Sequence, residues 1–159
     1  MTVRRVNRSA LVPYSAEQMF AVVNDVPRYP EFLPWCKDSE VLSETSDVMI
    51  ARLTLAKSGL QQDFTTHNEL HHPDMIKMDL VNGPFSRLSG EWKFQPLGED
   101  GCRASMHLEF DFSSLLFNMT LAKVFEPAPL SHRYPALTYL PLAQENHSTN
   151  QIYALPPVR

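Results

Sequence analysis

Apolar residues spaced three and four apart form the first strong pattern in the chain, over residues 16–23. They are Ala16, Met19, Phe20 and Val23, which fall on one face of an α-helix. Ser15 directly precedes this stretch and Gln18 lies three residues further on, so the two form a capping box. Tyr14 is placed to pack on Met19 as a hydrophobic staple. The pattern predicts an amphipathic helix that begins after Ser15 and ends near Asn24.

A second, aromatic helical element is expected immediately afterwards. Pro27 suits the first turn of a helix, where its missing N–H removes no hydrogen bond. Tyr29, Phe32, Leu33 and Trp35 then place four large apolar side chains in one short element. A surface helix does not need so many, so this element is expected to pack on a core.

The pattern changes to alternation with period two in the middle of the chain, over residues 37–112. Apolar residues alternate with polar ones over residues 88–94 and again over residues 102–112, which is typical of half-buried strands. The turn sequence Gly-Glu-Asp-Gly at residues 98–101 joins the two runs. They are therefore predicted to form a β-hairpin.

Shorter runs at residues 49–55, 64–70 and 76–80 predict further strands, again separated by turn residues. Consecutive strands joined by short turns form an antiparallel meander. With helices before and after the meander, the fold class is α+β.

One face of the predicted sheet is apolar and rich in aromatic and Met side chains. Its inward residues include Met78, Leu80, Trp92, Phe94, Met106, Leu108 and Phe110. Thr66 and Asn68 also fall at inward positions, so the face is not purely apolar. A concave face of this kind suits a flexible apolar ligand. A packed core without a cavity fits the same pattern, and the pattern alone leaves both open.

Length and charge limit the possible partners. The 159 residues correspond to one domain, and the net charge of −4 gives no general attraction to nucleic acid. Arg4, Arg5 and Arg8 form the only dense basic cluster, and they are the candidate nucleic-acid contacts. The alternative is that they are the solvated residues of a first strand.

The remaining chemistry does not assemble a catalytic or metal site. Cys36 and Cys102 have no metal-binding or redox spacing, and buried reduced thiols in a cytoplasmic protein are expected. His67 and His71 share a face of a predicted strand, but side chains four apart on a strand lie about 13 Å from each other. With His72 in a turn, no metal site is expected. Because no nucleophile, base and orienting group come together, the chain is interpreted as a binding protein and not an enzyme.

No signal peptide is recognised, and no run approaches the ~18 apolar residues of a membrane span.

The ordered motifs YSAEQMF, NDV, YPEFLPWC and NGPF resemble the START-like coenzyme Q-binding and ribosome-association toxin family, in its bacterial branch. The matching segments are residues 9–12, 14–20, 23–26, 29–36, 51–55, 64–66, 82–85 and 92–94. The resemblance covers residues 3 to about 126 and implies a helix-grip fold, in which a curved antiparallel sheet wraps a long C-terminal helix.

The resemblance also implies a lipid-sized pocket on the inner face of the sheet. The residues expected to line it are Phe20, Trp35, Phe64, Met78, Leu80, Leu88, Trp92, Phe94, Met106, Leu108 and Phe110. The implied ligand is ubiquinone or a similar polyprenyl lipid.

Two functions follow from the resemblance. The first is a non-catalytic toxin that binds the large ribosomal subunit and blocks subunit association in the cytoplasm. The second is a quinone-binding protein that supports respiration. A small cyclase or hydrolase on the same fold has no catalytic constellation to support it.

The C-terminal part departs from the family pattern. Residues 1–126 are expected to form the domain and residues 127–159 a Pro-rich, irregular tail. Ser113 or Ser114 can cap a final helix whose apolar stripe would be Leu115, Leu116, Met119, Leu121, Ala122 and Phe125. Pro127 and Pro129 cut this helix short, because an interior proline costs about 3 kcal/mol. A shifted reading frame is one hypothesis, which sequencing of the encoding DNA tests, and a tail that docks on the sheet is the other.

Overall fold

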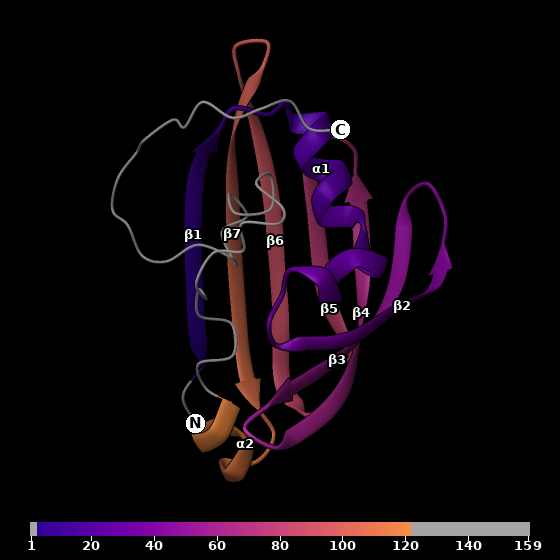
Figure 1. Cartoon of the computed structure of the whole chain (residues 1–159), viewed down its shortest axis with the longest axis vertical. Helices are drawn as coiled ribbons and strands as arrows, with labels where there is room; N and C mark the ends of the chain where they lie inside the picture. The colour runs from indigo at the N-terminus through magenta and orange to yellow at the C-terminus, as the bar shows by residue number, and fades with distance from the viewer. Residues whose placement is uncertain (1–2, 122–159) are drawn as a thin grey trace.

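A strongly curved, fully antiparallel sheet dominates the computed structural model, which describes residues 3–121 (Figure 1). Seven strands lie in the order β1-β7-β6-β5-β4-β3-β2. They are β1 (Arg4–Val12), β2 (Cys36–Glu44), β3 (Val48–Lys57), β4 (Leu60–His71), β5 (Met75–Asn82), β6 (Phe85–Leu97) and β7 (Gly101–Phe112). The predicted meander and α+β class are confirmed.

Helix α1 (Ala16–Asn24) and the 3₁₀ helix η1 (Val26–Glu31) connect β1 to β2, which lie at opposite edges of the sheet. The connection therefore crosses the concave face and covers part of it (Figure 1). The predicted capping box is present, since the Ser15 hydroxyl accepts from the Gln18 N–H at 3.2 Å and the Gln18 side chain accepts from the Ser15 N–H at 2.9 Å. Residues Ala16, Met19, Phe20 and Val23 of α1 are buried, as predicted.

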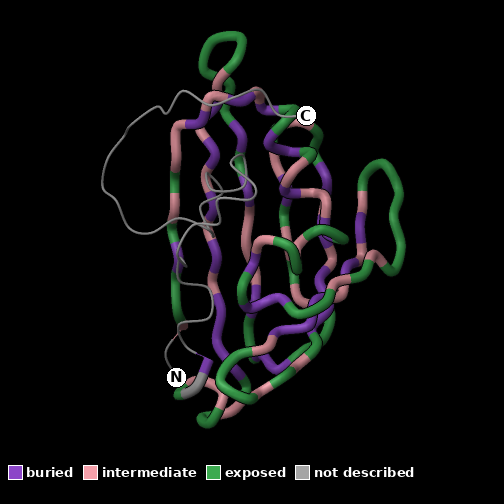
Figure 2. Tube along the Cα trace, viewed as in Figure 1, coloured by how far each residue is buried: buried purple, intermediate pink, exposed green. Residues whose placement is uncertain are grey.

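The core lies between α1, η1 and the concave face of the sheet, where buried positions face one another (Figure 2). Even-numbered residues 102–110 of β7 are buried and odd-numbered ones are partly exposed. This alternation confirms the predicted strand. Asp111 breaks the alternation: it is only 4% exposed, and the Ser86 hydroxyl donates to its Oδ2 at 3.1 Å.

Helix α2 (Leu115–Leu121) follows β7 and lies at one end of the sheet. Ser114 caps it, because its hydroxyl accepts from the Phe117 N–H at 3.1 Å. The expected inward stripe is partly wrong: Leu115, Leu116 and Met119 are 61–77% exposed. Phe117 packs on Phe112 and Leu121 is fully buried, so these residues, four apart, form the inward face instead.

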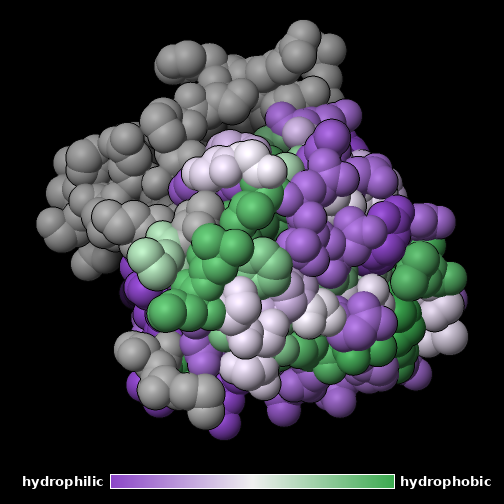
Figure 3. All heavy atoms as spheres, turned by 90° about the horizontal axis from the view of Figure 1, so that it is seen from below, coloured by the Kyte–Doolittle hydropathy of each residue, from purple (hydrophilic) through white to green (hydrophobic). Residues whose placement is uncertain are grey.

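The exposed residues of α2 contribute to an apolar surface at this end of the molecule (Figure 3). The expectations for residues 122–159, including the Pro-rich tail, lie outside the described residues. Within the part of the chain that the structure describes, no helix has the length and apolar character needed to span a membrane.

Candidate functional site

An apolar cavity of about 60 Å³ lies between η1 and the concave face of the sheet. Seven of the eleven residues expected to line a pocket do line it: Trp35, Phe64, Met78, Leu88, Trp92, Met106 and Leu108. By volume the cavity accommodates roughly four water molecules. The cavity is therefore much smaller than the lipid-sized pocket that the resemblance implies.

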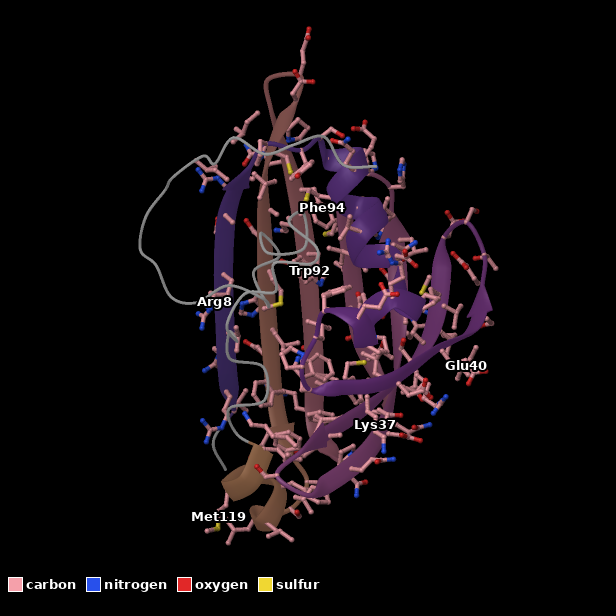
Figure 4. All side chains as sticks on the ribbon, viewed as in Figure 1. Arg8, Lys37, Glu40, Trp92, Phe94 and Met119 are labelled. Carbon is pink, nitrogen blue, oxygen red and sulfur yellow. The ribbon has the colours of Figure 1, made fainter. Side chains whose placement is uncertain are left out.

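The other four expected residues, Phe20, Leu80, Phe94 and Phe110, do not line this cavity. Phe20 reaches from α1 to Phe94, with ring centroids 6.0 Å apart. Phe94 also stacks on Trp92, with ring centroids 6.2 Å apart, and both residues lie on β6 (Figure 4). Phe20, Phe94 and Phe110 are buried in the core, and Leu80 is partly buried against it.

Seven lining residues were not predicted as site residues: Val26, Tyr29, Leu33, Ala51, Leu53, Thr66 and Asn68. Three of them come from η1 and the segment after it. The aromatic cluster in that segment was the signal that could have identified them. Ala51 and Leu53 were recognisable as strand residues. Their position in the cavity wall was not, because it depends on the order of the strands, which places β3 beside the cavity.

Trp35 closes the cavity at the junction between η1 and β2. Its ring stacks on Phe64, with centroids 6.2 Å apart and planes inclined by 28°. Its carbonyl accepts from the Ala56 N–H at 2.8 Å, which ties the junction to β3. Trp35 is thus both buried in the core and part of the cavity wall.

A polar pair interrupts the apolar lining. The Thr66 hydroxyl donates to Asn68 Oδ1 at 2.9 Å, and the two side chains are only 6% and 7% exposed. Within the described residues, the Asn68 amide nitrogen forms no hydrogen bond. Among the described residues, Arg8 Nε is the one fully buried side-chain polar atom that lacks a partner, so the Asn68 amide nitrogen keeps some exposure and can meet a ligand. An apolar pocket with one polar position is a common form of ligand site.

Among the described residues of the cavity wall, Tyr29 is the one that is ionisable, and its geometry does not suit acid–base chemistry. Its hydroxyl donates to the Val23 carbonyl, and burial raises its pKa well above the ordinary range of tyrosine. Ser39 on β2 holds η1 in place, because its hydroxyl donates to the Val26 carbonyl at 2.7 Å. The described lining residues therefore offer an apolar surface and hydrogen bonding, and none of them is an activated nucleophile.

The three predicted nucleic-acid contacts do not share one surface. Because successive residues of a strand point to opposite faces, Arg5 is separated from Arg4 and Arg8. Arg5 is on the outer face, where its Nε donates to Glu109 Oε1 at 3.0 Å. Arg8 is half-buried and donates to the neighbouring Asn7 carbonyl. What looks like one cluster in the sequence is divided by the pleat of β1.

The histidines occupy separate environments. His71 lies 3.5 Å from Glu69 on the outer face of β4, and the His72 ring packs against Phe20 with centroids 4.9 Å apart. Among the described residues, no group of three or more His, Cys, Asp or Glu residues is arranged to hold a metal ion.

The two buried cysteines give a testable pH dependence. Burial, with a smaller contribution from Asp38, raises the pKa of Cys36 to about 11. Burial, with a smaller contribution from Glu17, raises the pKa of Cys102 to about 11. Unfolded thiols lose their protons near pH 8.5. The stabilisation from the neutral thiols is therefore complete below about pH 8.5 and is lost as the pH rises through about 11.

We expect the free energy of unfolding, measured by urea denaturation, to fall over this alkaline window. The Cys36→Ala/Cys102→Ala double variant is the control, and its decline with pH should be shallower. Equal declines in the two proteins would show that the thiols do not cause the loss.

Comparison with known proteins identifies the family. Residues 12–129 match the model of the family described as polyketide cyclase/dehydrase and lipid transport. The chain belongs to this family. It is 50% identical over 123 residues to a ribosome association toxin of Pseudomonas aeruginosa, covering 77% of this chain and 85% of that protein. It is 47% identical over 122 residues to a persistence and stress-resistance toxin of Escherichia coli, covering 77% of each.

A more distant relative is a mitochondrial coenzyme Q-binding protein of Drosophila melanogaster, 32% identical over 126 residues. The match covers 77% of this family member but only 52% of the fly protein. The resemblance to toxins and coenzyme Q-binding proteins is thus confirmed at the level of the family.

Solved structures confirm the helix-grip, START-like fold. An 18 kDa protein from Caulobacter crescentus is 30% identical with a TM-score of 0.58, over 78% of this chain and 86% of that one. An aromatase/cyclase from a Streptomyces species has a TM-score of 0.64 at 22% identity, over 71% and 70%. The second likeness supports the fold alone. Relatives above 45% identity are named as toxins, while structural neighbours include enzymes.

Proposed function

We propose that this protein is a non-catalytic, toxin-like factor that binds the large ribosomal subunit in the cytoplasm and blocks its association with the small subunit. The observation that carries the proposal is the 46–50% identity to proteins named ribosome association toxins. That identity extends over 77% of this chain. The apolar lining that the described residues form agrees with a binding function.

Sedimentation tests the proposal directly. The purified chain is mixed with large and small subunits, and the mixture is separated on a sucrose gradient. We expect the chain in the large-subunit fractions and a loss of joined ribosomes as it approaches one copy per large subunit. Small subunits alone are the control and should not carry the chain. Its absence from large-subunit fractions at low salt would refute the proposal.

A quinone-binding role is the second candidate, and the Thr66–Asn68 pair is the observation that favours it. The Asn68 amide can donate a hydrogen bond to a carbonyl or hydroxyl oxygen of an otherwise apolar ligand. The cavity of about 60 Å³ is too small for a quinone ring. Binding therefore requires η1, which supplies Val26 and Tyr29 to the wall, to move away from the sheet.

Lipid extraction and mass spectrometry test this role. We expect near one quinone per purified chain, and much less from the Thr66→Val/Asn68→Leu variant. Removing both polar partners should leave stability unchanged or raise it, because no buried donor is then left unpaired. A quinone content equal to that of the unmodified chain would rule out recognition by this pair, and an empty unmodified chain would rule out the role.

A further inference from the structure

Basic residues are concentrated on one half of the sheet. Strands β1, β6 and β7 carry six basic and three acidic residues, whereas β2 to β5 carry four basic and six acidic ones. The first three strands are neighbours in the sheet, in the order β1-β7-β6. Figure 4 shows the two edges, with Arg8 on β1 and Glu40 on β2. A chain with a net charge of −4 thus has one locally positive half.

A trough of about 370 Å³ crosses the outer side of these three strands. Ser9 and Ser105 are register partners, as are Asn7 and His107, and Lys93 and Glu91 continue the two rows onto β6. Because the serine side chains are short, they form the floor of the trough, and the longer side chains of Asn7, His107, Glu91 and Lys93 form its borders. The trough therefore presents hydroxyl, amide, imidazole and ammonium groups, together with the Glu91 carboxylate.

The acidic residues of this face are already matched with cations. Glu109 accepts from Arg5 at 3.0 Å and also lies 3.8 Å from Arg87, so two cations share one carboxylate. Glu91, which borders the trough, lies 3.3 Å from Lys93. Arg103 reaches the Ser9 hydroxyl at 3.4 Å and has no ion pair within the described residues. Positive charge remains after these pairings.

We propose that this trough binds the phosphate backbone of ribosomal RNA, an inference that rests on the proposed function. Side chains of these types account for most protein contacts with phosphates. The outward positions of β1, β6 and β7 carry no exposed aromatic ring among the described residues, so bases have no stacking platform. Recognition here is by charge and backbone shape and is independent of base sequence.

The test compares two variants that each remove two positive charges. Lys93→Gln/Arg103→Gln changes the trough, and Lys57→Gln/Lys77→Gln changes the acidic half of the sheet. Sedimentation with large subunits and binding to a labelled, mixed-sequence RNA duplex are measured at several salt concentrations. Circular dichroism and the urea midpoint verify that both variants fold.

We expect the trough variant to bind both partners at least about tenfold more weakly at low salt, with a log–log salt slope shallower by roughly 1.4–1.8. The control variant should bind like the unmodified chain. Equal weakening in both variants would overturn the proposal, because net charge alone would explain it.

The remaining outcomes separate this proposal from the proposed function. If the unmodified chain binds subunits and the trough variant does so equally well, the proposal that the trough binds RNA is refuted while the proposed function stands. If the unmodified chain binds the duplex through the trough but not the subunits, the proposed function fails instead. Binding to neither partner overturns both.

Discussion

Trp35→Ala is expected to lower the free energy of unfolding by about 3–5 kcal/mol, the usual cost of deleting a large buried aromatic side chain. The indole is 7% exposed and stacks on Phe64, so its removal leaves a hole beside the existing cavity. Domains of this size are stable by only about 5–15 kcal/mol. The variant should therefore be close to unfolding at 37 °C.

Urea denaturation measures this loss, and two variants serve as controls. Trp35→Phe keeps an aromatic ring on Phe64 and should retain most of the stability. Leu42→Ala removes a side chain that is 49% exposed and should cost little. A Trp35→Ala protein as stable as the unmodified chain would show that Trp35 is not part of the core. If it also bound its ligand normally, Trp35 would not be part of the cavity wall either.

The parts of the fold that sequence patterns predicted are those set by local spacing. The capping box of α1 needs only Ser15 and Gln18, three residues apart, and the structure forms both hydrogen bonds. The β6–β7 hairpin needs only alternation on each side of a short turn. In each case the interacting residues are close in sequence, so the pattern contains the information.

The cavity was predicted only in part, because its wall combines residues that are far apart in sequence. Leu53 on β3 and Leu108 on β7 meet at the same hollow only because the sheet curves under η1. The inward placement of Thr66 and Asn68 followed from alternation, but their hydrogen bond and their position in the cavity wall did not. A period-two pattern identifies a face, whereas a cavity depends on the shape that the face adopts.

The same limit applies to charge. The Arg4, Arg5 and Arg8 cluster is evident in the sequence, yet the pleat of β1 divides it. Arg103 and Lys93 are not near these arginines in sequence, and the strand order β1-β7-β6 places them on the same half of the sheet. For α2, the apolar residues were too numerous for spacing alone to decide which of them face inward.

Gly83→Ala is the second change with a large expected effect, at the turn between β5 and β6. Gly83 has a φ of +152°, which L-residues rarely adopt, and such backbone strain costs about 1–3 kcal/mol. An added Cβ would also lie 2.5 Å from Phe64 Cβ and 3.1 Å from Phe64 Cα. Because one of these atoms belongs to the backbone of β4, relief requires a shift of the strand, which costs roughly another 1–3 kcal/mol.

Gly98→Ala provides the matched control for this prediction. Gly98 also has a positive φ, +69°, but an added Cβ there would meet no atom within 4 Å. Its substitution should therefore cost only the backbone term, about 1–2 kcal/mol. A thermal or urea unfolding series on the two variants measures both losses, and the excess loss at Gly83 combines its more strained backbone with the crowding of Phe64. Phe64 lines the cavity and stacks on Trp35, so Gly83→Ala should also disturb the cavity wall, while Gly98→Ala should not. Equal destabilisation by the two substitutions would mean that β4 yields freely at Phe64 and that the wall is not rigid at this point.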